Sequence, residues 1–212
     1  KATTREVTDE STLISEINTA NPGDTISIQN NITKTQPKVI AKELIIEGNG
    51  YTLTGSEGWT STSGNQTMFT AQLSDAKLTL RNINLVRGPK YGVQSYDGAT
   101  VILDNVNITD FKYGGVLVNG GKLEVRDLHL GRNGTSSNNG IEIDKGAAAT
   151  NNPTLVMNGV LKSDVTENIV RVADNGNLKD FTIENAEGTT NKVFVTLSLI
   201  HIWRCRRLNR CR

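Results

Sequence analysis

The stretch KLTLRNINL at Lys77–Leu85 decides the fold, because the chain repeats it as TVILDNVNI at Thr100–Ile108 and KLEVRDLHL at Lys122–Leu130. A weaker copy, TLVMNGVLK, occupies Thr154–Lys162, and a degenerate copy starts at Leu178. The first apolar residues of the three clear copies are 23 and 22 residues apart. A unit this short cannot bury its own apolar face, so successive copies must stack on one another to form a core.

A third short segment of alternating polar and apolar residues follows each copy. These segments span Tyr91–Ala99, Gly114–Gly121, Gly140–Ala147 and Asn168–Gly176. One coil of about 22 residues therefore reads strand, bend, strand, loop, strand and turn. This pattern predicts an all-β, right-handed parallel β-helix with three short strands per coil. An antiparallel sandwich would not repeat the phrase at a constant offset, and a propeller needs a period near 40 residues.

The repeat predicts which side chains face inward and which face outward. The inward columns are Leu78, Val101, Leu123 and Leu155, then Leu80, Leu103, Val125 and Met157, then Ile83, Val106, Leu128 and Val160. Among the outward rows, Arg81, Asp104 and Arg126 alternate in charge, which predicts a ladder of surface ion pairs. Asn82 and Asn105 form one amide row, and Asn84 and Asn107 form another. We expect these side chains to hydrogen-bond along the stack.

The N-terminal segment, residues 1–24, is predicted to hold a capping helix. Asp9–Ala20 places Leu13 and Ile17 on one face at helical spacing, and the acids at its start favour a helix N-terminus. Because a solenoid needs a cap over its open apolar end, we expect this helix to cover the first coil. The β-helix is expected to span residues 25–196, with two less regular coils preceding Lys77.

The last 16 residues, Leu197–Arg212, distort the composition of the chain. They contain five Arg, no acid and both Cys, so residues 1–196 carry a formal charge of −4 although the whole chain carries +1. An acidic body lacks the basic stripe that nucleic-acid binding needs. No run of about 18 apolar residues predicts insertion into a membrane. The segment LSLIHIWRCRR resembles a translated sequencing adapter, so we expect 197–212 to be non-native. The chain starts at Lys1 without an initiator Met, and we expect it to be a fragment.

The opening LISEINTANPGDTISIQNNI (Leu13–Ile32) and the rungs TLRNINLV, ILDNVNITDFKYGGVLVNGG and LEVRDLHL resemble pectate-lyase-like adhesive domains of large Gram-positive surface proteins. The resemblance implies an extracellular protein, secreted or attached to the cell wall, that acts in adhesion rather than catalysis. It places no catalytic residue on this chain. The resemblance to true lyases in fold does not establish an activity.

Two Lys-Tyr pairs, Lys90-Tyr91 and Lys112-Tyr113, lie 22 residues apart and hence one coil apart, with Tyr96 close to the first pair. Stacked in this way, they are either a tyrosine ladder that packs over the bend or a platform for a sugar ring and its acidic groups. Trp59, in the insertion between Ser56 and Thr67, is either an exposed contact or the anchor of that loop.

One row of the predicted turns is acidic, with Asp97, Asn119, Asp144 and Asp174 at equivalent positions. Asp and Asn before Gly tolerate positive φ angles, which explains the row without a ligand, and Asp144 with Asp174 remains a weak Ca²⁺ candidate. We expect no other cofactor.

The sequence predicts a non-catalytic, rod-like module that binds a host or environmental glycan or a protein surface. The main alternative is a polysaccharide lyase or glycoside hydrolase acting on acidic polysaccharide. A phage or host-interaction spike is the third. The oligomeric state is not specified.

Overall fold

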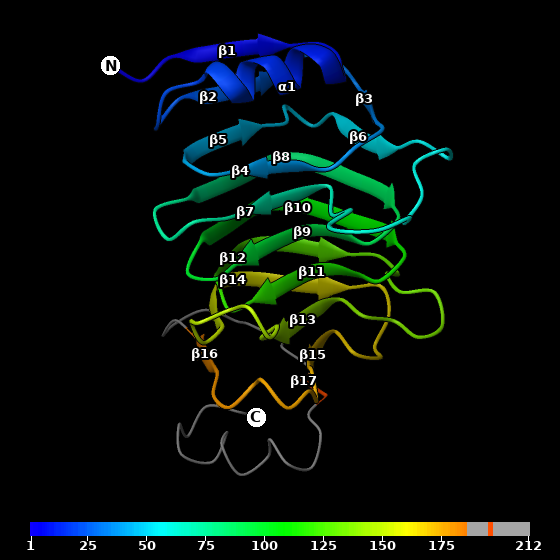
Figure 1. Cartoon of the computed structure of the whole chain (residues 1–212). Coiled ribbons are helices and arrows are strands. Elements are labelled where there is room, and N and C mark those ends of the chain that lie inside the picture. The colour runs from blue at the N-terminus through cyan, green and yellow to red at the C-terminus, as the bar shows by residue number, and fades with distance from the viewer. Residues whose placement is uncertain (186–194, 197–212) are drawn as a thin grey trace.

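A computed structural model describes residues 1–185 and 195–196 (Figure 1). Within them, one helix and two β-sheets form a single stack. The helix is α1 (Glu10–Thr19). Sheet A holds β1 (Thr4–Val7), β2 (Thr25–Ile28), β3 (Ile32–Lys34), β5 (Glu43–Glu47), β6 (Thr52–Gly55), β8 (Lys77–Gly88), β10 (Thr100–Phe111), β12 (Lys122–Leu130), β14 (Thr154–Ser163) and β16 (Thr182–Asn185). Sheet B holds β4 (Lys38–Ile40), β7 (Phe69–Ala71), β9 (Tyr91–Tyr96), β11 (Gly114–Asn119), β13 (Ile141–Asp144), β15 (Val170–Val172) and β17 (Val195–Thr196).

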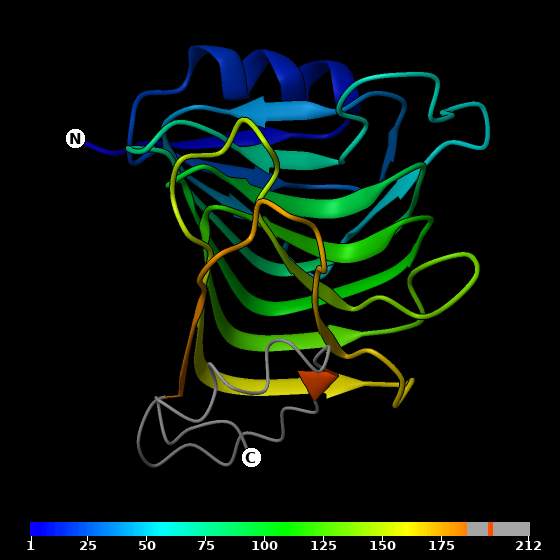
Figure 2. The ribbon, with the colours of Figure 1, turned by 60° about the horizontal axis from the view of Figure 1, so that its bottom comes forward.

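The chain alternates between the two sheets, so that β8, β10, β12 and β14 stack in sheet A while β9, β11, β13 and β15 stack in sheet B (Figures 1 and 2). Every strand ladder of the described residues is parallel. One isolated antiparallel bridge joins Tyr96 and Gly120. The all-β, parallel character of the predicted fold is therefore confirmed, and an antiparallel sandwich is excluded.

The first inward column lies where the repeat predicts it. Val101 pairs with Leu78 on one side and Leu123 on the other, and Leu123 pairs with Leu155. All four side chains are fully buried. Leu44 of β5 pairs with Leu78 and extends the column toward the N-terminus. Removing such aliphatic columns from water is the main stabilising contribution to a fold of this kind.

Three bends of sheet A, between β5 and β6 and inside β8 and β10, depend on asparagine. Asn49, Asn82 and Asn105 adopt φ angles of 51°, 52° and 55°, a left-handed conformation that Asn tolerates better than most residues. In β8 and β10 the two predicted short strands form one bent strand of 12 residues, whereas β2 and β3 remain separate. The two amide ladders are confirmed, because Asn105 Nδ2 donates to Asn82 Oδ1 at 2.9 Å and Asn107 Nδ2 donates to Asn84 Oδ1 at 2.6 Å.

The prediction that Val160 faces inward is wrong. Val160 is 38% exposed, and Leu161 takes its place as the partner of Leu128. The cause is an extra residue in the bend of β14, which shifts the register between Met157 and Leu161 relative to β12. Gly159 accommodates this bend, because a Cβ atom there would lie 1.7 Å from the carbonyl oxygen of Arg126.

Two other features of the predicted stack are corrected. The degenerate copy does not begin at Leu178, because Ile183 of β16 pairs with Leu155. The ion-pair ladder through Asp104 is also absent from the described residues. Arg81 instead pairs with Glu47 on the preceding coil, and Arg126 pairs with Glu124 of its own strand at 3.0 Å. Each arginine thus has a nearer glutamate than the aspartate that the repeat placed between them.

The helix α1 lies at the N-terminal end of the stack (Figure 1). Asp9 is its N-cap, accepting a hydrogen bond from the Thr12 amide at 2.8 Å, and Leu13 and Ile17 are buried. The strand β1, which the sequence did not reveal, pairs with β2 beside the helix. In the described residues, no helix is long or apolar enough to cross a membrane.

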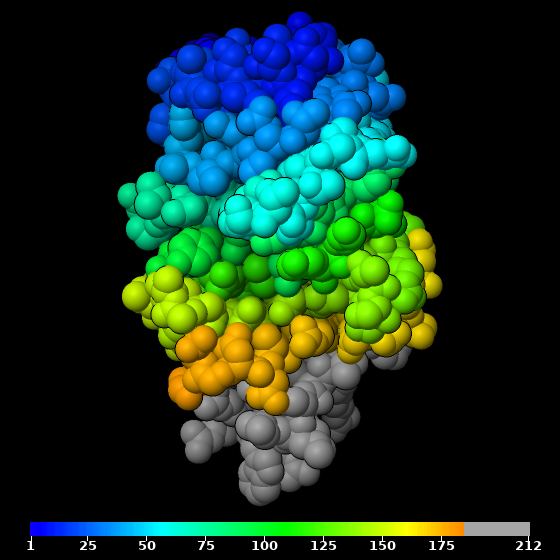
Figure 3. All heavy atoms as spheres, turned by 45° about the vertical axis from the view of Figure 1, so that its right-hand side comes forward, coloured from blue at the N-terminus to red at the C-terminus, as the bar shows by residue number. Residues whose placement is uncertain are grey.

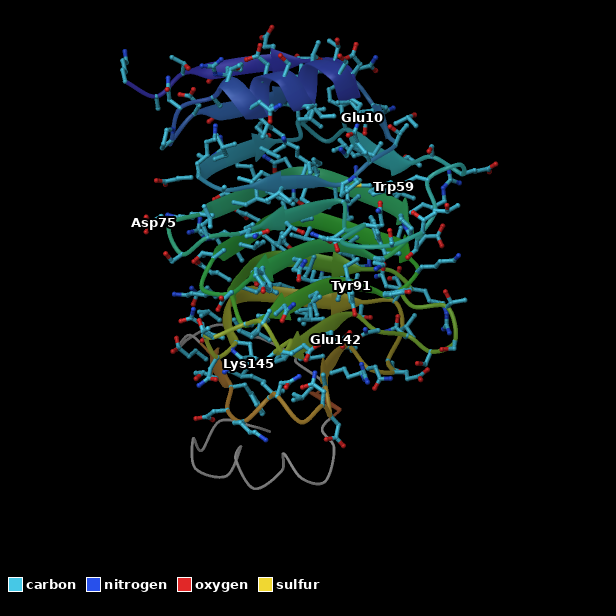
Figure 4. The ribbon with its side chains drawn as sticks, in the orientation of Figure 1. Glu10, Trp59, Asp75, Tyr91, Glu142 and Lys145 are labelled. Carbon is cyan, nitrogen blue, oxygen red and sulfur yellow. The ribbon has the colours of Figure 1, made fainter. Side chains whose placement is uncertain are left out.

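A buried lysine lies beneath the helix. Lys34 of β3 has a fully buried side chain, and its Nζ atom is 3.2 Å from Glu10 Oε2 and 5.5 Å from the ring centroid of Phe69. Burial lowers the pKa of Lys34, and the charge of Glu10 opposes this shift. Glu10 also accepts a hydrogen bond from the Thr35 amide at 2.7 Å, so one carboxylate joins the first turn of α1 to the end of β3 (Figure 4).

The motif Asn21-Pro22-Gly23-Asp24 fixes the turn that follows the helix. Gly23 adopts a φ of 90°, which glycine tolerates without strain. The carboxylate of Asp24 accepts hydrogen bonds from the Thr3 amide at 2.8 Å, the Asn21 amide at 2.9 Å and Arg5 Nε at 3.0 Å. These donors lower the pKa of Asp24 well below its ordinary value, and the Thr3 amide has the largest effect. One aspartate therefore holds β1, the turn and β2 together.

The predicted non-native segment 197–212 lies outside the described residues.

Candidate functional site

The outer face of sheet B carries one continuous row of side chains across successive coils. Its members are Thr70, Gln94, Leu117, Glu142 and Arg171, which are register partners from β7 to β15. Glu142 points outward because its neighbours in β13, Ile141 and Ile143, are fully buried in the core. The row therefore places an acid and a base on adjacent coils of the outer face.

A cavity of about 440 Å³ opens where β9 and β11 begin. Tyr91, Lys112, Tyr113, Asn139, Glu142, Arg171 and the segment 134–137 line it. Pockets of this size suit a small ligand such as a saccharide unit. The lining residues come from four successive coils, those of β9, β11, β13 and β15, and from the loop between β12 and β13, so the stacking itself creates the cavity.

Glu142 is the buried acid of the cavity, with a side chain that is 10% exposed. Its Oε2 atom accepts hydrogen bonds from the Tyr91 hydroxyl at 2.6 Å and from Asn139 Nδ2 at 2.8 Å, and its Oε1 atom is 3.3 Å from Arg171 Nη1. Figure 4 shows Tyr91 and Glu142 on the same side of sheet B. Burial, followed by the charge of Glu142, raises the pKa of Tyr91 far above its ordinary value. Tyr91 therefore acts as a neutral hydrogen-bond donor.

Asn139 joins the loop to the strands. Its Nδ2 atom also donates to the carbonyl oxygen of Tyr113 at 3.0 Å, so two acceptors fix the orientation of the amide. Gly114 is required beneath it, because a Cβ atom there would lie 2.8 Å from Asn139 Nδ2 and 2.9 Å from Tyr91 Cε1. The loop is further fixed by Asn133 and Asn138, both buried and hydrogen-bonded to the backbone.

The structure divides the five predicted ligand-binding residues. Tyr91, Lys112 and Tyr113 line the cavity. The rings of Tyr91 and Tyr113 meet edge to face, with centroids 6.0 Å apart, and Tyr113 is 49% exposed. The predicted tyrosine contact therefore exists, and Tyr113 is the ring that remains open to a ligand.

Lys90 and Tyr96 do not line the cavity. Lys90 Nζ donates to the carbonyl oxygen of Gly64 at 2.6 Å and lies 5.6 Å from the ring centroid of Tyr113. Tyr96 is at the far end of β9, five residues and roughly 16 Å from Tyr91 along the strand. The two Lys-Tyr pairs thus have different roles, although they are one repeat apart.

Trp59 anchors the insertion between β6 and β7, which lies across the surface in Figure 3. It is 8% exposed, and its Nε1 atom donates to Gln66 Oε1 at 2.9 Å. Of the two interpretations that the sequence left open, the loop anchor is the one that its burial supports.

Three members of the acidic turn row make structural hydrogen bonds, and one of them is Asn119, whose Oδ1 atom accepts a hydrogen bond from the Gly146 amide at 2.8 Å. Asp97 adopts a φ of 42°, as expected for Asp before Gly, and its Oδ1 atom accepts hydrogen bonds from the Thr150 and Asn151 amides at 2.9 Å each. Asp144 accepts hydrogen bonds from the Lys145 amide and Asn175 Nδ2, whereas Asp174 is exposed. Within the described residues, no three His, Cys, Asp or Glu side chains gather in a cluster. The Ca²⁺ candidate at Asp144 and Asp174 stays a prediction without a third acidic ligand.

The sequence reasoning missed Glu142, Arg171 and Asn139. Glu142 is 51 residues from Tyr91, so no local spacing connects them. A signal existed in the third strands, where IEID and VRV place Glu142 and Arg171 at the same outward position with opposite charges. Stacking those strands as well as the first two would have placed both residues in one row.

Comparison with known families gives one match. Residues 4–122, more than half of the chain, match the family described as "Putative pectate lyase-like adhesive domain". This region includes Tyr91, Lys112 and Tyr113, whereas the loop, Glu142 and Arg171 follow it. Neither a search of curated proteins nor a search of solved structures found a significant match. The chain therefore belongs to the pectate lyase-like adhesive domain family.

Proposed function

We propose that the chain is a right-handed parallel β-helix, residues 25–196, with residues 1–24 as its cap and 197–212 as a non-native tail. The alternation of the chain between two parallel sheets supports the solenoid. The burial of Leu13 and Ile17 against the first coil supports the cap. Each coil adds about 4.8 Å to the rod, the spacing of adjacent strands.

The proposed function of this rod is adhesion, through binding of a glycan in the cavity between Tyr113 and Arg171. One observation carries the proposal. A single cavity is lined by an exposed aromatic ring, two exposed cations and a buried carboxylate, which belong to Tyr113, Lys112, Arg171 and Glu142. Sugar-binding sites combine an aromatic surface for the ring with a few placed polar groups for its hydroxyls. The family to which the chain belongs is described as adhesive, which supports the same function.

We propose that the site is non-catalytic. A lyase or hydrolase needs a base or acid that is free to exchange a proton with its substrate. Glu142, the acid of the cavity, is already bound by Tyr91, Asn139 and Arg171, and Tyr91 is held as a neutral donor. These contacts occupy both carboxylate oxygens of Glu142 and the hydroxyl of Tyr91, which suits recognition better than proton transfer.

The proposed location is extracellular, either secreted or attached to a cell wall, with a host or environmental glycan as the partner. An adhesive domain acts at a surface, and the acidic body of residues 1–196 argues against nucleic acid as a partner. No cofactor enters the proposal.

The test is a glycan array probed with the 212-residue protein and two tyrosine variants. The wild type should retain a limited set of glycans. Tyr113→Ala should lose them, because the open ring is removed, whereas Tyr96→Ala should keep them, because Tyr96 lies outside the cavity. The retained glycans are then incubated with the protein, and cleavage is followed by the ultraviolet absorption of unsaturated lyase products and by the release of reducing ends. Cleavage would contradict the non-catalytic assignment, and equal loss in both variants would contradict the location of the site.

A further inference from the structure

We infer that the cavity selects an anionic saccharide, with the acidic group of the sugar held by Lys112 and Arg171 and not by Lys90. This inference rests on the proposed glycan-binding function and specifies its ligand. It assigns the charge recognition to two residues on different coils, one of which lies outside the predicted Lys-Tyr pairs.

The cavity holds more cationic than anionic groups. Lys112 and Arg171 line the cavity and are both exposed, and Glu142 is the one acid that lines it among the residues that the structure describes. Arg171 uses Nη1 to contact Glu142, and its other guanidinium donors have no partner among residues 1–185 and 195–196, so they can bind an acceptor. No hydrogen bond or ion pair within the described residues engages the side chain of Lys112. Among the described residues, the cavity therefore presents the unpaired ammonium group of Lys112 and the guanidinium donors of Arg171 that do not contact Glu142.

Neutral donors extend this surface. The hydroxyl groups of Ser136 and Ser137 line the cavity, are exposed and have no protein partner among the described residues. Hydroxyl and ammonium donors together suit the oxygens of a carboxylate or sulfate group and the ring hydroxyls beside it. A neutral sugar would leave the charge of Lys112 without a partner.

The cations of this site stand out because the body of the protein is acidic. Residues 1–196 carry a formal charge of −4, so this part of the molecule repels polyanions. Within residues 1–196, attraction of an anionic group must therefore be local and depend on the cavity; the five Arg of 197–212 are present equally in the wild type and in both lysine variants. This separates the inference from nonspecific binding to any acidic polymer.

Lys90 provides a matched control. It is the equivalent lysine one coil earlier, but its ammonium group donates to the carbonyl oxygen of Gly64 and does not line the cavity. Lys90→Gln and Lys112→Gln remove the same charge from the same face at neighbouring coils. A general effect of net charge predicts equal losses, whereas the inferred site predicts a loss for Lys112→Gln alone.

The experiment measures the binding of matched glycans that share one saccharide backbone. They differ in one substituent, which is a carboxylate, a sulfate or a neutral hydroxyl group. The array carries all three forms, and affinities of retained forms are measured by titration at low and high NaCl. We expect the wild type to bind an acidic form at least tenfold more tightly than its neutral form, and to lose this preference at high salt. Lys112→Gln should weaken acidic binding about tenfold and leave neutral binding unchanged, while Lys90→Gln should match the wild type. A preference shared by carboxylate and sulfate indicates recognition of charge, and a preference for one of them identifies the group.

The outcomes separate this inference from the function on which it rests. Retention of no glycan overturns both. Binding of neutral and acidic forms with equal affinity overturns the charge assignment and leaves glycan binding intact, as does an equal loss in Lys90→Gln and Lys112→Gln. Both lysines are on the surface, so the variants should keep the thermal midpoint of the wild type.

Discussion

The ion pair between Glu10 and Lys34 predicts a specific pattern of stability changes. Glu10→Gln leaves the ammonium group of Lys34 buried without an opposite charge. Removing one partner of a buried pair costs about 3–5 kcal/mol, and the lower end applies because the Glu10 side chain is 14% exposed. For a protein of this size, about 3 kcal/mol lowers the thermal midpoint by roughly 6–12 °C.

Lys34→Met should have a much smaller effect. Methionine fills a similar volume beside Phe69, and Glu10 keeps the hydrogen bond from the Thr35 amide, so the expected change lies within about 1 kcal/mol. The double variant Glu10→Gln/Lys34→Met should therefore be more stable than Glu10→Gln alone, because the unpaired charge is gone. Glu6→Gln, an exposed acid at the same end, is the control and should change stability by less than about 0.5 kcal/mol.

The assay is thermal unfolding followed by circular dichroism, with urea titration where the transition is reversible. Equal costs for the two single variants, adding up in the double variant, would refute the reasoning. That result would mean that Lys34 does not need Glu10 in order to be buried.

Two further predictions concern the turn at Asp97 and the bend of β14. Hydrogen bonds from Asn151, and to a smaller extent from Thr150, lower the pKa of Asp97 to about 2. The contribution of Asp97 to stability is therefore complete above about pH 4, the pKa of an unfolded aspartate, and is lost as the pH falls toward 2. The thermal midpoint of the wild type should drop more steeply over this pH range than that of Asp97→Asn. Gly159→Ala should destabilise by about 3 kcal/mol, because its Cβ would meet a carbonyl oxygen at 1.7 Å, whereas Gly58→Ala, with open space around it, should change the urea midpoint little.

Much of the fold could be predicted from the sequence because the repeat combines two independent patterns. Alternation sets which side chains face inward, and the constant offset sets which residues lie above one another. Leu78, Val101, Leu123 and Leu155 follow from these patterns alone. The offset fails where a bend gains a residue, as at Gly159, and this shift exchanges Val160 for Leu161. The copy at Thr154–Lys162 matches the repeat weakly, so its sequence does not show that the bend contains one extra residue.

The site was predicted less completely because it depends on side chains from different coils. The Lys-Tyr pairs lie at the edge of the stack where the cavity opens, and Tyr91, Lys112 and Tyr113 line this cavity. Their equivalence in the repeat suggested that Lys90 acts as Lys112 does, but the insertion between β6 and β7 provides Gly64 as an acceptor for Lys90 alone. Loops of different length on each coil thus give equivalent positions different partners.

Lys34 is the clearest case that the sequence could not reveal. A lysine in a strand of alternating pattern is normally placed on the outside, and Lys34 follows Thr33 at the end of β3. Its burial depends on Glu10 of the helix and Phe69 of sheet B, which are 24 and 35 residues away. Such a pair becomes visible only when the helix is placed over the first coil.

A crystal structure of the protein with a glycan retained on the array would test the location and chemistry of the site most directly. We expect the sugar in the cavity, with its ring against Tyr113 and its acidic group within hydrogen-bonding distance of Lys112 and Arg171. A glycan bound on the outer face of sheet A, or in the cavity with its acidic group pointing to solvent, would contradict this proposal.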